Sequence, residues 1–327
     1  MSSYPNSVFE PRVVENKPPE FYLPEKTTRL FAEDINDPNG EIVAVEEELG
    51  LLPKGAAASV RARLDLADEA AQVFAKSQVI AVLRSLVSDV SDVKGLWFFD
   101  KVGSEAALSD RSGAGHNLDL SGQAQTLNPG VVGLAKYLTL AGPSSFYDTA
   151  DHADFSVAGP LPFTVVWAGV LVDATGSSFL CKVDQTTGNA KYEWGFRSST
   201  GDKLVGVVYQ DGVNYIARIF NTAISGDQGE FHVYVMSYSG GLTNAAIKLY
   251  RDGVRVDDGN LGMGVFSNTN DTVALPASYC LNSSSQKVEA MKGKVAFLSF
   301  IKNVELSADS IMSLSLVLQG LGNALAA

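Results

Sequence analysis

Hydrophobic and polar residues alternate along the chain from about residue 95 onward, and the alternation is clearest between residues 231 and 256. Within 231–235 and 247–251, apolar residues recur at every second position up to Asp252-Gly253, and the alternation resumes at Val254. A period of two is typical of a strand. Asp-Gly between two such runs predicts a type I′ hairpin, because both central residues of that turn need positive φ. The stretch therefore predicts an Asp-Gly hairpin that sets the register of two neighbouring strands.

Short alternating runs separated by turn residues continue through residues 94–327. The candidate strands are LWFFD, KYLTLA, FTVVWAGVLV, SFLCKV, KYEWGFR, KLVGVVYQ, YIARIF, FHVYVMSY, AIKLYR, VRVDD and KVAFLSFI. Many short strands between Gly, Asn, Asp and Ser turns predict a mainly β protein, a sandwich of antiparallel sheets. One late helix is expected, because Ser307 can cap it and Ile311, Leu314 and Leu318 share one face.

Residues 39–93 follow a helical period instead. Ile42, Val45 and Leu49 are spaced for a short helix that ends at Gly50. A longer helix follows from about residue 57, and its apolar positions step by four and three residues, which is a heptad rhythm. These positions are Val60, Leu64, Ala67, Ala71 and Phe74, with a change of face near Gln78. The stripe must be covered, either by self-association, as in trimeric fibrous proteins, or by packing on the β region. The heptad rhythm favours a self-associating, coiled-coil region.

Residues 1–38 combine frequent prolines with recurring apolar side chains. Prolines at this density exclude long helices and favour extended backbone. A plain linker would contain fewer apolar residues, so we interpret the segment as an extended arm that docks on a partner. A tail packed on its own domain, or a disordered one, is the alternative. The candidate docking residues are Tyr4, Phe9, Phe21, Tyr22, Leu30 and Phe31.

The overall charge narrows the classes of partner. The chain has 327 residues, a formal net charge of −12 and a sequence pI near 4.7, and no run of basic residues offsets this charge. Such a surface repels phosphate backbones, so no nucleic-acid partner is expected. The start has no signal-peptide pattern, and the longest apolar stretches are too short to span a membrane. Cys181 and Cys280 lie in apolar strands and are expected to be small buried side chains, with a disulfide as the alternative. This usage fits a protein made in a reducing cytosol.

Catalytic motifs are missing from the sequence. A glycoside hydrolase needs two close carboxylates, and sandwich glucanases carry them as Glu-x-Asp-x-x-Glu on one strand, a string that does not occur here. His116, His152 and His232 are not paired at metal-ligand spacing, so we expect structural or surface roles for them. Neither a Gly-x-Ser-x-Gly elbow nor a P-loop is present. No catalytic residue and no cofactor is therefore expected.

Two sets of side chains could bind a ligand. Asp148, Asp151 and Asp154 are closely spaced oxygen ligands in a loop, which suits Ca²⁺, although acidic loops are common on a protein of this charge. The aromatic residues of the middle strands could form a platform on which sugar rings stack, or they could fill the sandwich core. The candidate glycan-binding residues are Tyr192, Trp194, Tyr209 and Tyr215.

Five fragments of residues 94–327, in order, resemble the laminin-G-like, concanavalin A-like family. They begin with GLWFFDKVGSEAALSDRSGAGHNLDLSG, whose Asp110, Ser112, Gly113, Gly115 and Leu120 match an Asp-x-Ser-Gly-x-Gly segment of that family. The others are GLAKYLTLAG, PFTVVWAGVL, the stretch from FHVYVMSYSGG to IKLYRDGVRV, and MKGKVAFLSFIKNVELSADSIMSL. The resemblance implies a jelly-roll β-sandwich. It fixes the fold better than the function, because functional sites are grafted on folds.

The stretch NGEIVAVEEELGLLPKGAAASVRARLD is similar to a helix-loop-helix of tailed-phage structural proteins. In those proteins it lies between a virion-attachment segment and an exposed domain. This resemblance implies a non-enzymatic decoration or fibre protein, made in the host cytoplasm and displayed on the virion surface. Its arm would dock on capsid, neck or tail proteins, its helices would form a homotrimer, and its sandwich would face outward.

The alternative function is a carbohydrate-binding module or adhesin that recognises a host surface glycan. A groove with exposed aromatic side chains would favour it, whereas an arm ordered only against a partner would favour the virion protein. A hydrolase is disfavoured by the missing carboxylate pair.

Overall fold

A computed structural model describes residues 60–100, 105–122, 124, 130–132, 135–157, 161–186, 191–211, 214–262, 274 and 276–323. The chain divides into two compact units, Met1–Ala71 and Gln72–Ala327. The predicted arm at 1–38 and the short helix at 42–49 lie outside the described residues, as do the side chains of Val60, Leu64 and Ala67.

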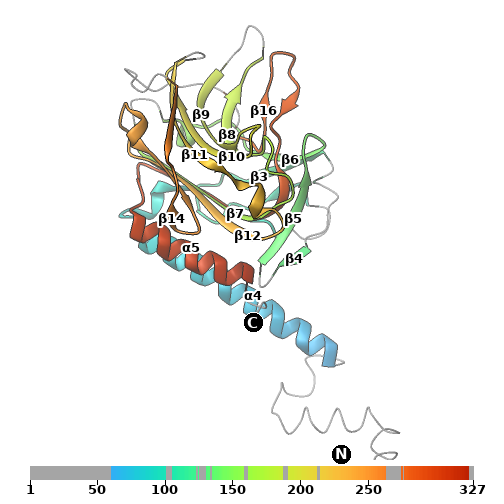
Figure 1. Cartoon of the computed structure of the whole chain (residues 1–327). Helices are drawn as coiled ribbons and strands as arrows, with labels where there is room; N and C mark the ends of the chain where they lie inside the picture. Colours follow the sequence, from blue (N-terminus) through green and yellow to red (C-terminus); the bar gives the residue numbers. More distant parts are fainter. Residues whose placement is uncertain are drawn as a thin grey trace, which may run out of the picture. The chain divides into compact units, whose positions relative to one another are not determined.

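The second unit contains two large sheets and one small one (Figure 1). Sheet A has the order β14-β13-β12-β7-β18-β5-β4, with β1 also paired to β18. Its strands are β1 (Val93–Phe98), β4 (Gly130–Val132), β5 (Ala135–Ala141), β7 (Phe163–Leu171), β12 (Phe231–Tyr238), β13 (Ile247–Arg251), β14 (Val254–Arg255) and β18 (Lys292–Lys302). All of these pairs are antiparallel.

Sheet B has the order β15-β11-β10-β9-β8-β16-β17. Its strands are β8 (Ser178–Asp184), β9 (Lys191–Ser198), β10 (Lys203–Tyr209), β11 (Tyr215–Ala223), β15 (Gly259–Gly262), β16 (Cys280–Leu281) and β17 (Lys287–Val288). The small sheet joins β2 (Ala107–Leu108), β3 (Leu118–Gly122) and β6 (Ser145–Asp148). Short 3₁₀ helices lie at Val90–Asp92 (η2), Ala153–Phe155 (η4), Ile224–Asp227 (η5) and Asn244–Ala246 (η6).

An apolar core rich in aromatic rings lies between sheets A and B. Trp97, Trp167 and Trp194 are fully buried in it. Phe163 and Phe300 stack there with ring centroids 5.6 Å apart. Rings of this size bury the most apolar area per residue, so they dominate the stability of the sandwich. The predicted mainly β sandwich is confirmed, and every predicted strand is present. Its strand pairs are antiparallel apart from the parallel contact of β16 with β8.

Two helices cover the outer face of sheet A. They are α5 (Ala308–Asn323) and the part of α4 (Val60–Ser85) that follows Ala71, both drawn beneath the sandwich in Figure 1. Val79 and Leu83 of α4 are buried in the same cluster as Leu314 of α5 and Val166 of β7. Because one face meets sheet B and the other meets helices, β7 is buried at every position. No helix among the described residues is long and apolar enough to cross a membrane.

The late helix begins as predicted from its sequence. Ser307 Oγ accepts a hydrogen bond from the Ser310 N–H at 3.1 Å, and Ile311, Leu314 and Leu318 are buried. The two parts of the longer predicted helix, α4, differ in how far their apolar side chains are buried. After Gln78 its apolar residues pack on sheet A, which is one of the two arrangements considered for it. Ahead of that point Ala71 is half-buried and Phe74 is 66% exposed, so the homotrimer stays a prediction.

The Asp252-Gly253 turn has the predicted conformation. The φ angles are +53° at Asp252 and +84° at Gly253, as a type I′ hairpin requires. Asp252 Oδ1 accepts from the Val233 N–H at 2.9 Å, and Oδ2 lies 2.7 Å from His232 Nδ1. Burial acts to raise the pKa of Asp252, but the bonds from His232 and Val233 outweigh it and lower that pKa. The turn therefore fastens β13 to β12, and its function is structural.

Candidate functional site

The outer face of sheet B carries a second apolar cluster. Val205, Val207 and Ala217 are buried in it, together with the free thiols Cys181 and Cys280. The outcome for the two cysteines matches the expectation of small buried side chains. Three tyrosines from β9, β10 and β11 lie in one line on this face: Tyr192, Tyr209 and Tyr215, here called the tyrosine row. Their ring centroids are 5.2 Å apart for the first pair and 5.6 Å apart for the second.

A β-bulge in β9 separates Tyr192 from Trp194. Lys182 of β8 pairs with Trp194, and Val183 pairs with Tyr192, so Glu193 is the extra residue. Without the bulge, Tyr192 and Trp194 would point to the same face. Trp194 instead lies in the core, where its Nε1–H donates to the Phe155 carbonyl at 2.9 Å. The glycan-binding role predicted for Trp194 is therefore wrong, because a fully buried ring cannot stack on a sugar.

The members of the tyrosine row differ in exposure. Tyr209 in the middle is only 7% exposed, and burial raises its pKa despite the nearby Arg197 guanidinium, which acts to lower it. The predicted stacking of a sugar on Tyr209 is therefore wrong as well, because its ring is also buried. Tyr192 and Tyr215, at the two ends of the row, are half-buried. Those two rings are the part of the predicted glycan platform that the structure leaves accessible.

The predicted calcium ligands do not converge on one point. Asp148 accepts from the Tyr279 hydroxyl at 2.9 Å, and burial raises the Asp148 pKa. Asp151 lies 3.0 Å from Lys182 Nζ. Asp154 is the third, and it faces two histidines instead of the other two aspartates. Each carboxylate thus faces a different protein group, and the trio does not form a calcium cage.

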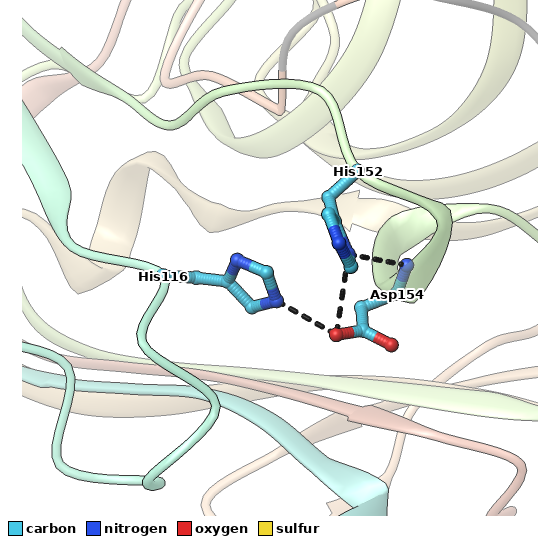
Figure 2. Close-up of side chains that lie close together, drawn as sticks. All are labelled: His116, His152 and Asp154. Atoms are coloured by element: carbon cyan, nitrogen blue, oxygen red, sulfur yellow. Dashed lines mark hydrogen bonds and ion pairs between the residues drawn. The ribbon is translucent and has the colours of Figure 1, made fainter.

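Figure 2 shows the histidine cluster, which consists of His116, His152 and Asp154. Asp154 Oδ2 lies 2.7 Å from His116 Nε2 and 3.2 Å from His152 Nδ1, and the three ligand atoms lie within 4.8 Å of one another. Lys94 Nζ approaches the other oxygen at 3.4 Å. Burial acts to raise the pKa of Asp154, but His116, Lys94 and His152 together lower it. This cluster was not predicted from the sequence, in which its only local signal is the His-x-Asp spacing at 152–154.

Two loops position the histidine cluster. In the first, the Asp110 carboxylate accepts the backbone N–H groups of Leu96, Ser112, Gly115 and His116. This carboxylate therefore holds the turn that precedes β3, and His116 with it. In the second loop, His152 caps η4: its Nδ1 accepts from the Asp154 N–H at 3.1 Å. The Phe155 ring of η4 lies 5.0 Å from that of His116 and so joins the second loop to the first.

A buried ion pair lies beside the second loop. Lys182 and Glu193 have fully buried side chains, and Lys182 Nζ is 2.6 Å from Glu193 Oε2. The ammonium also donates to Ser156 Oγ at 2.9 Å, while Glu193 Oε1 accepts from the Val157 N–H at 2.6 Å. Each charge therefore has several partners, as burial demands. The bulge that turns Tyr192 outward is the same one that places Glu193 against Lys182.

Comparison with known proteins finds a likeness of fold only. No family model matches the chain, and no curated protein matches it. The binding domain of paraclostridial mosquitocidal protein 1 is 13% identical, with a TM-score of 0.47 over 69% of this chain and 52% of that one. Trypanosoma rangeli sialidase, in complex with sialic acid, is 12% identical, with a TM-score of 0.49 over 80% and 40% of the two chains.

A third structure is domain 4 of AbnA, an extracellular arabinanase of Geobacillus stearothermophilus, in complex with arabinotriose. It is 15% identical, with a TM-score of 0.44 over 68% of this chain and 98% of that one. The chain thus spans about half of the toxin domain and less than half of the sialidase. Identities this low assign no function.

Proposed function

We propose that the protein is a non-catalytic β-sandwich that binds carbohydrate on the outer face of sheet B. The observation that carries the proposal is the tyrosine row. Tyr192 and Tyr215 present half-buried rings at its two ends. A tyrosine suits a sugar because its apolar ring can stack on the C–H face of the sugar while its hydroxyl can hydrogen-bond to the sugar hydroxyls. The outer face of sheet A is covered by α4 and α5, so sheet B is the large face that remains for a ligand.

Polar groups adjoin one end of the tyrosine row. Asn214, next to Tyr215, accepts the Gln210 N–H at 2.8 Å and donates through its own N–H and side-chain amide to Asp211 at 2.7 Å each. These bonds fasten residues 210 and 211, just after β10, to Asn214, just before β11. Amide and carboxylate groups beside an aromatic ring are the usual means by which a shallow site fixes the orientation of a polar ligand.

Truncation of the end tyrosines tests the proposal. We expect Tyr192→Ala and Tyr215→Ala each to weaken binding of the best glycan found by array screening about tenfold, because aromatic anchors carry most of the energy of an interface. Isothermal titration of the purified variants measures this. Tyr137→Ala is the matched control, since Tyr137 is a half-buried tyrosine on sheet A, and it should bind like the parent. Glycan binding that neither Tyr192→Ala nor Tyr215→Ala weakens would place the ligand elsewhere.

A second candidate is a structural protein displayed on a tailed-phage virion, docked through its arm on capsid, neck or tail proteins and trimeric through its helix. The supporting observation lies on α4. Val73 and Phe74 are 60% and 66% exposed, just ahead of the part of the helix that packs on sheet A. Large apolar side chains on a helix surface are typical of a contact with another chain.

Light scattering tests the second candidate. If α4 joins three copies, the full chain has the mass of a trimer, and removal of residues 1–71 together with Val73→Gln and Phe74→Gln leaves a monomer. The cut stops at residue 71 because Val79 and Leu83 belong to the core of the remaining unit. Met312→Gln on α5, at an apolar position 37% exposed, is the control for a general loss of surface hydrophobicity. A monomeric full chain would exclude self-association through this helix.

A further inference from the structure

We propose that the histidine cluster is a binding site for one divalent transition-metal ion of the Zn²⁺ class, which fastens the loop before β3 to the loop that carries η4. The cluster supplies two imidazole nitrogens and one carboxylate oxygen (Figure 2). Imidazole with carboxylate is a donor set that suits zinc and its neighbours, whereas Ca²⁺ takes oxygen ligands only. The proposal does not depend on carbohydrate binding.

The spacing of the donor atoms agrees with tetrahedral coordination. Bonds of about 2.0–2.1 Å at tetrahedral angles put neighbouring ligand atoms about 3.3 Å apart. His152 Nδ1 is already 3.2 Å from Asp154 Oδ2. His116 Nε2 lies 2.7 Å from that oxygen, so an ion requires this pair to open by only about half an ångström. The side chain of His152 is 53% exposed, which leaves a path for the ion and room for water as a fourth ligand.

The backbone around the donors is fixed before any ion binds. The His116 N–H is held by the Asp110 carboxylate at 3.0 Å, and the His116 carbonyl accepts from Trp97 Nε1–H at 2.8 Å. Asp154 lies within η4, whose first turn is capped by His152. His116 and Asp154 are 38 positions apart in the chain, so their meeting is a product of the fold and not of local sequence. The backbone positions of His116 and Asp154 are thus set before the ion arrives, whereas Nδ1 of His152 must exchange its hydrogen bond from the Asp154 N–H for the ion.

Two ammonium groups near the cluster oppose the binding of a cation. Lys94 Nζ lies 3.4 Å from Asp154 Oδ1 and partly neutralises the carboxylate. A second ammonium, that of Lys302, donates to the Ala153 carbonyl at 2.5 Å. Their repulsion lowers the affinity for a cation, so we expect a dissociation constant in the micromolar range and not tighter binding. Removal of the Lys94 charge should therefore strengthen metal binding, an effect that is not expected if the cluster has only a structural role.

Equilibrium titration of the full chain with ZnCl₂ at pH 7.5, followed by calorimetry, tests the proposal. The expected result is one Zn²⁺ per chain, with no comparable binding of Ca²⁺. His152→Ala and Asp154→Asn should each weaken binding tenfold or more, because each removes one of three protein ligands. Lys94→Gln should strengthen it severalfold. Thermal unfolding should show a zinc-dependent rise in Tm for the parent and none for His152→Ala.

His152 is the primary variant because its half-exposed side chain can be removed without opening the core. His152→Ser accompanies it, since the serine hydroxyl can still cap η4 but replaces the imidazole ligand, and it should also lose zinc binding. His232→Gln is the matched control: His232 pairs with Asp252 at the hairpin and should leave zinc binding unchanged. Absence of binding at 100-fold excess of Zn²⁺ would overturn the proposal, as would binding that survives both His152→Ala and Asp154→Asn. Co²⁺ gives an independent readout, because its visible absorption reports nitrogen and oxygen ligands in the parent and should be lost in His152→Ala.

Discussion

Replacing Lys182 with methionine is expected to lower the free energy of unfolding by about 3–5 kcal/mol, since it leaves the Glu193 carboxylate buried without its cation. Both side chains are fully buried, and the two charges are 2.6 Å apart. Lysine and methionine have similar lengths, so the loss reflects the uncompensated charge more than a cavity. Urea unfolding of the parent and the variant, with equal slopes, measures the difference.

Two comparisons separate the charge effect from other causes. Lys248→Met removes a cation from an ion pair with Glu305 whose side chains are 33% and 28% exposed, and it should cost no more than about 1 kcal/mol. The double variant Lys182→Met/Glu193→Gln should recover part of the loss, because the glutamine is neutral and can still accept from the Val157 N–H. Equal losses for Lys182→Met and Lys248→Met would show that burial does not control the energy of this pair.

Trp194→Ala is the second substitution with a large expected effect. It should destabilise the sandwich by about 3–5 kcal/mol, because it empties the space of an indole ring in a close-packed core. The ring stacks on Phe300 at a centroid distance of 5.2 Å and lies 5.5 Å from that of Phe163. Trp194→Phe keeps an aromatic ring and loses the hydrogen bond to the Phe155 carbonyl, which should cost about 1–3 kcal/mol because the carbonyl stays buried.

Substitutions at Trp194 should mainly lower stability, whereas substitutions at Tyr192 should mainly weaken glycan binding. Tyr192→Ala is expected to change stability less than Trp194→Ala, since its ring is half-buried, and to weaken glycan binding more than Trp194→Phe. Thermal unfolding and glycan titration of the same three proteins check this. If Trp194→Phe impaired binding as much as Tyr192→Ala without loss of stability, the assignment of these rings to opposite faces of β9 would be wrong.

Features that depend on local sequence could be predicted. The strands followed from alternation, and the hairpin followed from Asp252-Gly253, whose φ angles are both positive in the structure. The late helix followed from Ser307 and three apolar residues on one face. In each case the residues that determine the element lie close together in the chain, so a local sequence pattern is enough to predict it.

Features that depend on one irregular residue, or on contacts between distant segments, could not be predicted from the sequence. Alternation assigns Tyr192 and Trp194 to the same face, and the bulge at Glu193, whose carboxylate pairs with the buried Lys182, separates them. The histidine cluster joins two loops, so the spacing between His116 and Asp154 carries no signal in a single sequence. The helical period of residues 60–85 predicted an apolar stripe, but the period cannot say whether a sheet or a second chain covers it.

The place of β18 in sheet A has a consequence for how the chain is made. This strand pairs with β7 and β5 and also with β1, and its Ser299 hydroxyl donates to the Gly95 carbonyl across 204 positions of sequence. The strands β8 to β11 of sheet B are neighbours in both sequence and space, so they can pair while synthesis continues. Sheet A cannot close until residues 292–302 have left the ribosome. Until then β7, which is buried at every position of the folded protein, has an open edge, and an unpaired apolar edge of this kind favours aggregation until the last strand is made.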